Sequence, residues 1–326
     1  MQAILVQADH SLALQDAPDP VPGPGQALIE VHAAGLNRAD LSQRAGHYPP
    51  PAGESDILGL EVAGVIRQLG AGATGWQPGD RVCTLLGGGG YAELAVAPTA
   101  MLMPVPAGWS FQQAAGLPEV FLTAFLNLFL EGLLQQDERV LIHGGASGVG
   151  TAAIQLASLA GCHVFATAGS DEKTTVCRQL GAELAINYRQ EDFVERVREH
   201  TAGAGVDLVL DMVGADYLSR NLEALATCGR LVFISTLSGR RTELDIRVLM
   251  GKRLTLKGST LRSRPLDEKV RIKQALLERF WRDFEAGRLE VVMDSVYPLR
   301  DAEAAHARMR ENQNIGKIVL EVRGES

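Results

Sequence analysis

The chain has 326 residues, of which 46% are hydrophobic and 21% charged, a balance typical of a globular protein long enough for two domains. Its 31 lysines and arginines against 39 aspartates and glutamates leave a formal net charge of −8. This acidic balance argues against nucleic acid or an anionic membrane surface as the main partner. We therefore expect the partner to be a small molecule.

The cysteine spacing, the N-terminal residues and the longest apolar stretch favour an intracellular protein. No two cysteines are close enough in sequence for a CxxC metal or redox motif, so we expect buried, reduced side chains. They are Cys83, Cys162, Cys177 and Cys228. The N-terminus is too short and too weakly basic for a signal peptide. The apolar stretch 120–134 is interrupted by polar residues, which indicates a core helix rather than a membrane span. The sequence thus predicts a cytoplasmic protein.

The first third of the chain has the pattern of short β-strands. Strand-like runs lie at 27–34, 62–69 and 92–96, and turns rich in glycine and proline separate them. This punctuation favours a partly closed barrel over a helical bundle.

The pattern changes near Pro118, where a helix is expected to continue to about Gln135. Short apolar runs then alternate with helical stretches, which is typical of a doubly wound parallel sheet. The expected strands are 140–142, 163–168, 184–187, 206–211 and 230–234. The expected helices between them are 149–160, 172–180, 192–200 and 217–226.

After residue 260 the alternation ends in a charged helix at 266–286, followed by strands at 291–296 and 317–322. We therefore predict an α/β protein in which a Rossmann domain, residues 121–261, is inserted into a β-rich domain. Residues 1–120 and 262–326 would form that second domain, which would carry the substrate.

The segment 143–150 is the most informative one, because it leads from a predicted strand through a glycine-rich turn into a helix. A helix N-terminus offers unpaired N–H groups and a positive dipole end, and small residues let a pyrophosphate approach closely. Against the pattern G-x-G-x-x-G, Gly145 and Gly150 match the outer glycines and Ser147 takes the middle position. Ser147 could therefore hydrogen-bond the cofactor. The alternative is a glycine-rich turn without a ligand, but the strand–turn–helix context favours a dinucleotide.

The end of the next predicted strand bears on the choice of nucleotide. No acidic residue stands at its tip, where it would hold a ribose 2′-hydroxyl. Gly169 and Ser170 leave space, and Lys173 follows one turn into the helix, so a 2′-phosphate would fit. Asp171 and Glu172 count against this, although acids in the first turn of a helix have a structural explanation. The pattern favours NADPH over NADH.

Five segments together resemble the medium-chain dehydrogenase/reductase superfamily and, within it, the zeta-crystallin-like quinone oxidoreductases. They are 34–40, 59–65, 76–82, 143–150 and 314–320. The runs 36–46, 48–51 and 261–264 look closest to the tumour-suppressor-inducible group of that branch. The resemblance covers essentially the whole chain. It implies a GroES-like fold for the β-rich domain, a homodimer, and a cleft between the domains in which the nicotinamide meets the substrate.

Two departures from zinc-dependent relatives predict an enzyme without metal. Those relatives have a Cys where this chain has Asn37 and a His where it has Leu60. A catalytic zinc needs three protein ligands, and leucine cannot be one. Without a Lewis acid the substrate must accept a hydride easily, as a quinone or an alkene conjugated to a carbonyl does.

Candidate site residues follow from these arguments. Tyr48 is expected to face the substrate as a hydrogen-bond donor, and Asn37 is expected to turn its amide toward the cleft. The alternatives are that Tyr48 packs on the prolines that follow it, and that Asn37 bonds loop backbone. At the cofactor, the resemblance adds further positions to those that the glycine-rich turn and the following strand end indicate. The full set is Thr123, Gly145, Ser147, Gly148, Val149, Gly150, Gly169, Ser170, Lys173, Tyr188, Val213, Ser235, Arg262 and Lys317.

Three functions stay open at this point. The leading hypothesis is an NADPH-dependent quinone reductase, with ortho-quinones among its substrates. The second is an NADPH-dependent 2-alkenal or enone reductase on the same scaffold. The third belongs to another class, a pyridine-nucleotide-binding protein without useful turnover.

Overall fold

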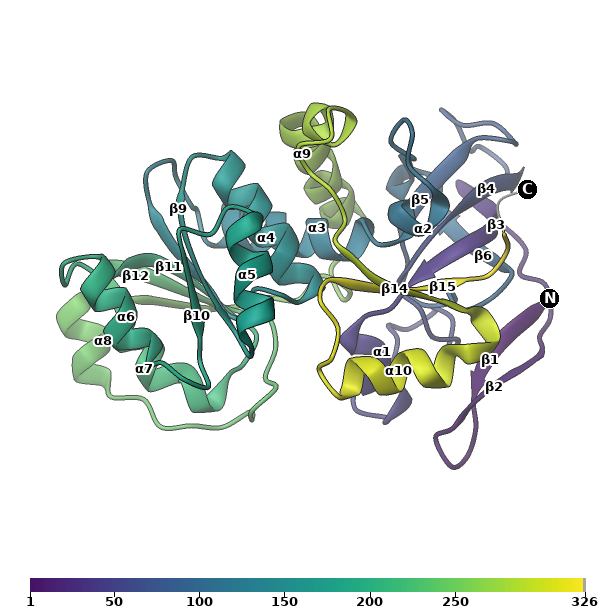
Figure 1. The fold of residues 1–326 in the computed structure, drawn as a ribbon. Helices are drawn as coiled ribbons and strands as arrows, with labels where there is room; N and C mark the ends of the chain where they lie inside the picture. Colours follow the sequence, from purple (N-terminus) through teal and green to yellow (C-terminus); the bar gives the residue numbers. More distant parts are fainter. Residues whose placement is uncertain (325–326) are drawn as a thin grey trace. The chain divides into compact units, whose positions relative to one another are not determined.

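The computed structural model describes residues 1–324 and divides into two compact units. Met1–Leu122 and the segment from Arg262 onward form the first unit, and Thr123–Leu261 forms the second. Figure 1 shows the ribbon, and each unit is described below by itself.

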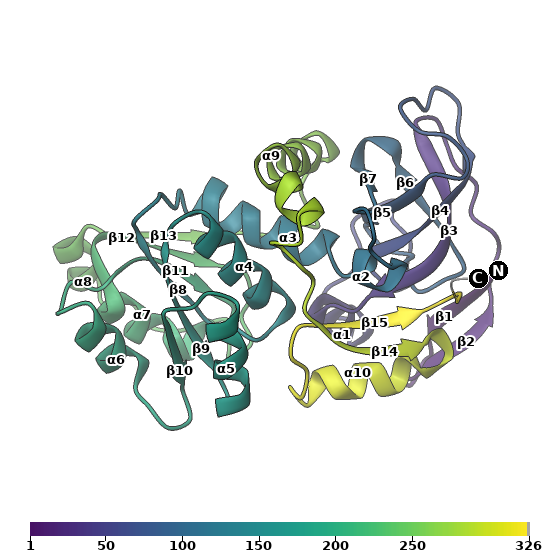
Figure 2. The same ribbon diagram turned by 45° about the horizontal axis from the view of Figure 1, so that its top comes forward.

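The first unit is built on a seven-stranded sheet in the order β14-β15-β3-β4-β5-β7, with β6 also paired to β3. A separate hairpin of β1 and β2 accompanies it. The strands are β1 (Gln2–Val6), β2 (Leu12–Asp16), β3 (Gln26–Gly35), β4 (Glu61–Leu69), β5 (Arg81–Leu85), β6 (Leu94–Pro98), β7 (Met103–Pro104), β14 (Met293–Pro298) and β15 (Lys317–Glu321). Strand β15 pairs antiparallel with β3, so the end of the chain returns to the sheet of its beginning (Figures 1 and 2).

The first unit also contains helices. They are α1 (Arg38–Arg44), η1 (Thr99–Met101), α2 (Phe111–Ala115), α3 (Pro118–Phe125, which enters the second unit), α9 (Leu266–Glu285), η4 (Leu299–Asp301) and α10 (Ala302–Arg310). Side chains from β3, β4 and α10, among them Ile29, Val62 and Met309, form one buried apolar cluster. This burial is the main stabilising term available to the unit.

The second unit is a doubly wound parallel sheet. Its six strands stand in the order β10-β9-β8-β11-β12-β13, and every pairing is parallel. Counted along the chain, this is the 3-2-1-4-5-6 order of the Rossmann fold, and the order reverses between β8 and β11. The strands are β8 (Arg139–Ile142), β9 (His163–Ala168), β10 (Leu184–Asn187), β11 (Val206–Asp211), β12 (Leu225–Phe233) and β13 (Thr255–Gly258).

One helix of this unit precedes its first strand, and the others connect the parallel strands. They are the π-helix η2 (Leu126–Glu131), α4 (Gly148–Leu159), α5 (Asp171–Gln179), α6 (Phe193–His200), η3 (Ala215–Tyr217), α7 (Leu218–Ala224) and α8 (Ile246–Lys252). Strands β8 and β11 are buried almost throughout, as expected where helices cover both faces of a parallel sheet. Their carboxyl ends are therefore the place at which backbone becomes available to a ligand.

Most predicted elements are confirmed. The α/β class is correct, and the five predicted strands and four predicted helices of the Rossmann part are all present, although β12 begins earlier, at Leu225. The strand expected at 92–96 is β6, two residues later, and the strand expected at 291–296 is β14, also two residues later. The prediction missed strands β1, β2, β5, β7 and β13 and helices α1, α2, α8 and α10, because these elements are short or amphipathic only in the tertiary context.

The prediction that every cysteine is buried is wrong for Cys228. Cys83, Cys162 and Cys177 are buried, and all four cysteines are free. Cys228 lies where the pairing of β12 with β11 jumps from Leu225 to Arg230, and within this irregularity Thr227 and Cys228 are exposed. It also has a positive φ of 64°.

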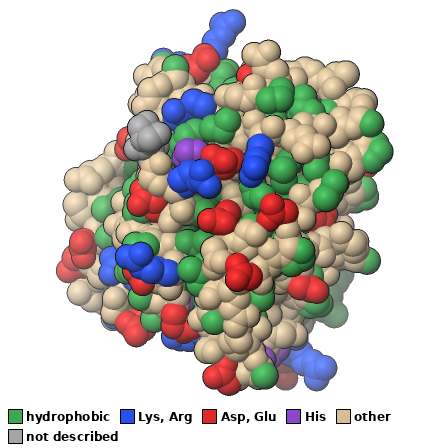
Figure 3. Space-filling view, turned by 90° about the vertical axis from the view of Figure 1, so that its right-hand side faces the viewer, with side chains coloured by type: hydrophobic (Ala, Val, Ile, Leu, Met, Phe, Trp, Pro, Cys, Tyr) green, Lys and Arg blue, Asp and Glu red, His purple; other side chains and the backbone are tan. Residues whose placement is uncertain are grey.

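The chemistry of the surface agrees with the acidic composition. Acidic and basic side chains are interspersed over the face drawn in Figure 3, and no extended basic area covers the described residues there. Within residues 1–324, no helix is both long and apolar enough to cross a membrane.

Candidate functional site

The glycine-rich turn 143–150 joins β8 to α4 in the second unit. Gly144 has a φ of 62°, a conformation that favours glycine. A Cβ atom on Gly150 would lie 2.2 Å from the carbonyl oxygen of Gly144. The turn therefore closes on itself only because a glycine stands at position 150.

Ser147 is the N-cap of α4. Its Oγ accepts a 3.0 Å hydrogen bond from Gly150 N, and its hydroxyl lies 3.6 Å from the sulfur of Met212. Helix α4 opens with Gly148 and Val149, and the first N–H groups of a helix have no intrahelical acceptor. Together with the positive helix end, these groups fit a pyrophosphate. The residues present therefore suit a dinucleotide.

The residues expected at a 2′-phosphate gather where β9 and β10 end. Tyr188 N donates to Ala168 O at 3.1 Å, and a Cβ on Gly169 would lie only 2.7 Å from Tyr188 Oη. Ser170 caps α5 by accepting from Lys173 N at 3.3 Å. Lys173 is half-buried and Tyr188 is 42% exposed.

The side chain of Asp171, next to Ser170 in the chain, has a hydrogen-bond partner. Its Oδ1 accepts a 2.8 Å hydrogen bond from the amide of Asn187. The acid at the start of α5 thus has a structural use in addition to its place at the positive helix end.

Three more candidates occupy separate places in the second unit. The carbonyl of Thr123 in α3 accepts from Asn127 Nδ2 at 2.8 Å. Val213 and Ser235 follow β11 and β12 at the carboxyl edge that also carries the turn 143–150. The N–H of Val213 donates to Asp211 Oδ1 at 2.5 Å, and Ser235 is exposed.

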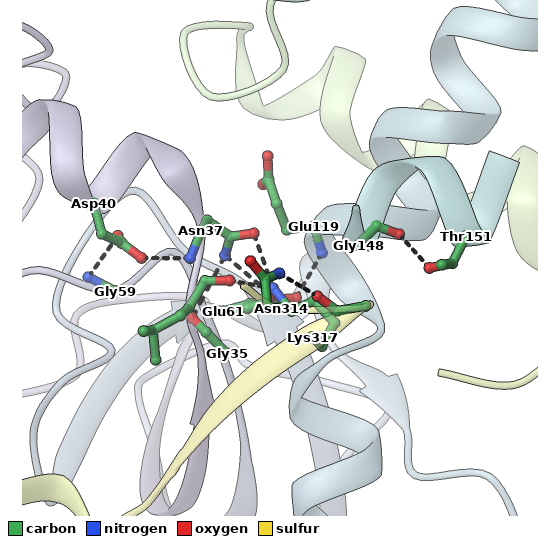
Figure 4. A network of polar contacts seen from close by, with 12 residues as sticks. Gly35, Asn37, Asp40, Gly59, Glu61, Glu119, Gly148, Thr151, Asn314 and Lys317 are labelled. Atoms are coloured by element: carbon green, nitrogen blue, oxygen red, sulfur yellow. Dashed lines mark hydrogen bonds and ion pairs between the residues drawn. The ribbon is translucent and has the colours of Figure 1, made fainter. Parts of the chain in front are cut away.

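In the first unit, Asn37 lies in a buried ionic network with Glu61 and Lys317 (Figure 4). Asn37 Nδ2 donates to Glu61 Oε1 at 2.9 Å, and its Oδ1 accepts from Lys317 Nζ at 2.9 Å. Lys317 Nζ also donates to Glu61 Oε1 at 2.6 Å and to the carbonyl oxygen of Leu36. All three hydrogens of the ammonium group therefore have acceptors on described residues.

Glu61 extends this network to helix α3. Its Oε2 accepts from Glu119 N at 2.8 Å, at the start of the helix. A Cβ on Gly35 would lie 2.4 Å from Glu61 Oε1, so the glycine makes room for the carboxylate. The amide of Asn37 thus bonds a carboxylate and an ammonium, in addition to a weak 3.5 Å contact with the loop carbonyl of Gly35.

Asp40, in the first turn of α1, belongs to a second buried polar group. Its carboxylate accepts from Asn37 N at 2.8 Å and from Tyr91 Oη at 2.9 Å, and Tyr91 Oη lies 3.1 Å from His306 Nε2. Burial raises the pKa of Asp40 to about 6 and lowers the pKa of His306 to about 4. Through the bond from Asn37 N to Asp40, these residues hold the backbone at Asn37 in place.

Tyr48 and Arg262 lie together in the first unit. The guanidinium carbon of Arg262 lies 5.2 Å from the centre of the Tyr48 ring, a cation–π arrangement. Arg262 is 5% exposed, and its Nη2 donates to Gly87 O at 2.6 Å and to Gln43 Oε1 at 2.7 Å. Burial raises the pKa of the Tyr48 phenol, so the hydroxyl is a neutral donor at pH 7. That hydroxyl makes no hydrogen bond to another residue within 1–324.

The donor set around Asn37 does not fit a catalytic zinc. Leu60 is buried and offers no donor atom, and Glu61 and Asn37 already bind the Lys317 ammonium. Among residues 1–324, no group of three or more His, Cys, Asp or Glu side chains is arranged to hold a metal ion.

Comparison with known proteins places this geometry in a family. Residues 23–107 match the alcohol dehydrogenase GroES-like domain, and residues 148–279 match the family described as zinc-binding dehydrogenase. The quinone oxidoreductase of Sus scrofa is 32% identical over 94% of this chain and 92% of its own. The chain belongs to the zinc-independent quinone oxidoreductase branch of the medium-chain dehydrogenase/reductase superfamily.

Other relatives of this medium-chain reductase have different substrates and nucleotides in their names. A 2-haloacrylate reductase of Burkholderia is 36% identical over 92% of this chain and 91% of its own. The structure of Escherichia coli quinone oxidoreductase complexed with NADPH has a TM-score of 0.88 at 29% identity, covering 98% of this chain and 99% of that one. A structure titled NAD-dependent alcohol dehydrogenase has a TM-score of 0.88 at 34% identity, covering 99% and 100%.

The reductase is thus an oxidoreductase that uses a nicotinamide cofactor. Sequence reasoning assigned no role to Glu61, Asp40 or Asp211. A signal was available for Glu61, which follows Leu60 directly in the segment 59–65. Asp40 and Asp211 gave no signal, because an acid near the end of a strand or in a short helix is usually solvated.

Proposed function

We propose that this protein is an NADPH-dependent quinone reductase that works without a metal ion. The observation that carries the proposal is the network of Asn37, Glu61 and Lys317, in which an ammonium group binds Asn37, the residue that by resemblance takes the place of a zinc-ligating Cys. A carbonyl group in such a site receives no Lewis-acid activation, so the substrate must itself be easily reduced. Quinones meet this condition because their reduction gives an aromatic product.

The nicotinamide cofactor, when bound, supplies the hydride. The turn 143–150 and the N-terminus of α4 would bind its pyrophosphate through backbone N–H groups. Gly169, Ser170, Lys173 and Tyr188 would surround the 2′-phosphate and thereby select NADPH.

Tyr48 would orient the substrate by donating a hydrogen bond from its free hydroxyl to a carbonyl oxygen. The Arg262 guanidinium would hold the Tyr48 ring, and the Lys317 ammonium would hold the Asn37 amide. Both basic residues were expected from the sequence at the cofactor. We propose these positioning roles for them instead, because their hydrogen-bond donors are engaged within the first unit. The proton that completes the reduction would come from water.

Reduction of an alkene conjugated to a carbonyl is the second candidate, which the 36% identity to a 2-haloacrylate reductase favours. It needs the same cofactor and the same hydrogen bond to a carbonyl oxygen. Steady-state kinetics with ortho-quinones, para-quinones and 2-alkenals, each with NADPH and with NADH, separates the two. Larger kcat/KM values for the alkenals would overturn the first proposal. Tight NADPH binding without turnover of any of these compounds would favour the third reading, a nucleotide-binding protein.

The expected homodimer also has a candidate seam in the second unit. Strand β13 is the last strand of the six-stranded sheet, and nearby Ile246 and Met250 are 60% and 71% exposed. We propose that a second copy covers this edge, because an open sheet edge beside exposed apolar side chains favours association. Light scattering on Met250→Lys should then show more monomer than the unchanged chain, and an unchanged mass would argue against this seam.

A further inference from the structure

Three buried polar side chains connect the strand ends of the second unit. His143 follows β8, Asp211 ends β11, and Asn221 lies in α7, and each has a relative exposure of 0%. His143 Nε2 lies 2.7 Å from Asn221 Oδ1, and Asn221 Nδ2 donates to Asp211 Oδ2 at 2.9 Å. Burial of this much polarity is costly unless every bond is made.

The hydrogen bonds of this chain have only one consistent direction. A carboxylate can only accept, so the amide nitrogen of Asn221 must face Asp211 and its oxygen must face His143. His143 must therefore carry its proton on Nε2, and its Nδ1 accepts from the hydroxyl of Thr167, 2.9 Å away in β9.

The protonation states of these groups agree with that direction. Burial, with a smaller effect of the Arg220 charge, lowers the pKa of His143 to about 4, so the ring is neutral at pH 7. Burial raises the pKa of Asp211 to about 6, which still leaves it ionised at pH 7. The rings of Phe193 and Tyr217 pack edge-on against the imidazole at 4.9 and 4.8 Å and keep water away.

The Asp211 carboxylate also accepts hydrogen bonds from the loop that follows it. Its carboxylate accepts from Val213 N at 2.5 Å and from Gly214 N at 3.2 Å. Gly214 has a φ of 94°, and a Cβ there would lie 3.0 Å from Gly239 O, so the loop has little freedom. The loop is therefore shaped by one buried carboxylate.

The same loop contacts the glycine-rich turn. A Cβ on Gly144 would lie 2.6 Å from the sulfur of Met212, and the Ser147 hydroxyl lies 3.6 Å from that sulfur. The hydrogen-bond chain from Thr167 to Asp211 thus ties the turn 143–150 to the loop 212–214 at the carboxyl edge of the sheet.

We propose that His143, Asn221 and Asp211 are positioning residues that hold the loop 212–214 and the turn 143–150 in the shape that receives the nicotinamide cofactor. This inference rests on the proposed function in that the cofactor is NADPH. None of the three side chains needs to touch the cofactor. Their effect is transmitted through the N–H groups of Val213 and Gly214 and through Met212.

The test exchanges the charge within the pair. In Asp211→Asn, a neutral amide with one acceptor oxygen replaces the charged carboxylate that binds the N–H groups of Val213 and Gly214. Asn221 also keeps its partners only if its amide and the His143 tautomer both reverse, so NADPH binding should weaken about ten-fold. Asn221→Asp places two carboxylates side by side and should weaken binding at least as much. In the double variant, the amide of residue 211 can donate to the carboxylate at 221 and accept from Val213 N. We expect its dissociation constant to return to within about three-fold of the unchanged protein.

The readouts are the NADPH dissociation constant by titration calorimetry, the melting temperature, and hydrogen exchange of peptides that cover residues 212–214. Exchange in these peptides should be faster in each single variant and slower again in the double variant. Thr201→Val is the matched control, because Thr201 Oγ1 accepts a buried bond from Gly205 N in the same unit, at another loop. It should lower the melting temperature and leave NADPH binding unchanged.

Single variants that bind NADPH as well as the unchanged protein, or a double variant that recovers neither binding nor slow exchange, would overturn the inference. If a single variant does not fold, the NADPH dissociation constant and the hydrogen exchange of the double variant, compared with those of the unchanged protein, still test the inference. Failure of the proposed function gives a different result. If the unchanged protein prefers NADH, the dissociation constants of the same variants are compared with NADH, and if it reduces no quinone, the binding comparison is made in the same way. A protein that binds neither nucleotide overturns both proposals.

Discussion

The ammonium group of Lys317 lies 2.6 Å from Glu61 Oε1, and both side chains are almost completely buried. Lys317 begins β15 and Glu61 begins β4, so this ion pair joins a strand near the end of the chain to a strand from its first third. The cost of removing both charges from water is met by the close contact and by the further bonds to Asn37, Leu36 and Glu119.

Replacing Lys317 by Met should lower the free energy of unfolding by about 3–5 kcal/mol, because it leaves the Glu61 carboxylate buried without its counter-charge. Urea denaturation measures this effect. The double variant with Glu61→Gln should recover part of the loss. Arg271→Met removes an exposed ion pair with Asp267 and should have little effect. Equal losses for Lys317→Met and Arg271→Met would contradict the prediction.

Lys173→Glu should raise the KM for NADPH at least ten-fold while changing the KM for NADH much less, because only NADPH carries the 2′-phosphate that would face this residue. Initial rates with both nucleotides at saturating quinone give the comparison. Arg247→Glu makes the same charge change at a 92% exposed side chain of the same unit and serves as the control. Equal changes for both nucleotides would remove Lys173 from the 2′-phosphate site.

Tyr48→Phe should lower kcat/KM for quinones about ten-fold, because it deletes a hydrogen bond to the substrate oxygen on which charge develops. The NADPH dissociation constant should not change. Tyr297→Phe deletes a hydroxyl from the same unit and provides the matched control. Unchanged quinone kinetics in Tyr48→Phe would support the alternative in which this ring only packs on the loop.

Between about pH 6.5 and 4, two pairs of buried groups should change the stability of the protein in opposite directions. The pKa of His306 is lowered to about 4, so the unfolded chain binds the proton more tightly and the stability from neutral His306 is lost in that window. His143, whose pKa is also lowered to about 4, acts in the same direction. Asp40 and Asp211, with pKa values raised to about 6, act in the opposite direction, because their folded forms bind protons more tightly.

His306→Gln isolates one of these contributions. When the pH is lowered from 6.5 to 4, the unfolding free energy of this variant should rise relative to that of the unchanged protein by up to about 3 kcal/mol, because the variant lacks the destabilising protonation of His306. Urea denaturation across this pH range measures the difference. His47→Gln, at an exposed position, should follow the unchanged protein. Parallel pH profiles for His306→Gln and the unchanged protein would refute the prediction.

The local patterns of the sequence were sufficient to predict most strands and helices of the Rossmann part. Strand and helix periods, and the glycines at 145 and 150, depend on residues close in the chain, so they predicted β8, the turn and α4 together. The same local logic explains Ser147 and Ser170, which both proved to be helix caps. It did not reveal that the Ser147 hydroxyl also lies beside Met212, because Met212 belongs to another strand end.

The sequence by itself thus determined the α/β class, the order of most elements, the glycine-rich turn and the absence of a zinc-ligand set at Asn37 and Leu60. Only the tertiary structure decided the partners of Lys317, Arg262 and Asp211. Lys317 and Arg262 bond residues from distant parts of the chain, such as Glu61 and Gly87, and Asp211 bonds Asn221 of the helix that follows its strand. A long charged side chain has the same sequence signature whether it is solvated or buried. Burial and hydrogen-bond partners emerge only when the sheet brings its strand ends together.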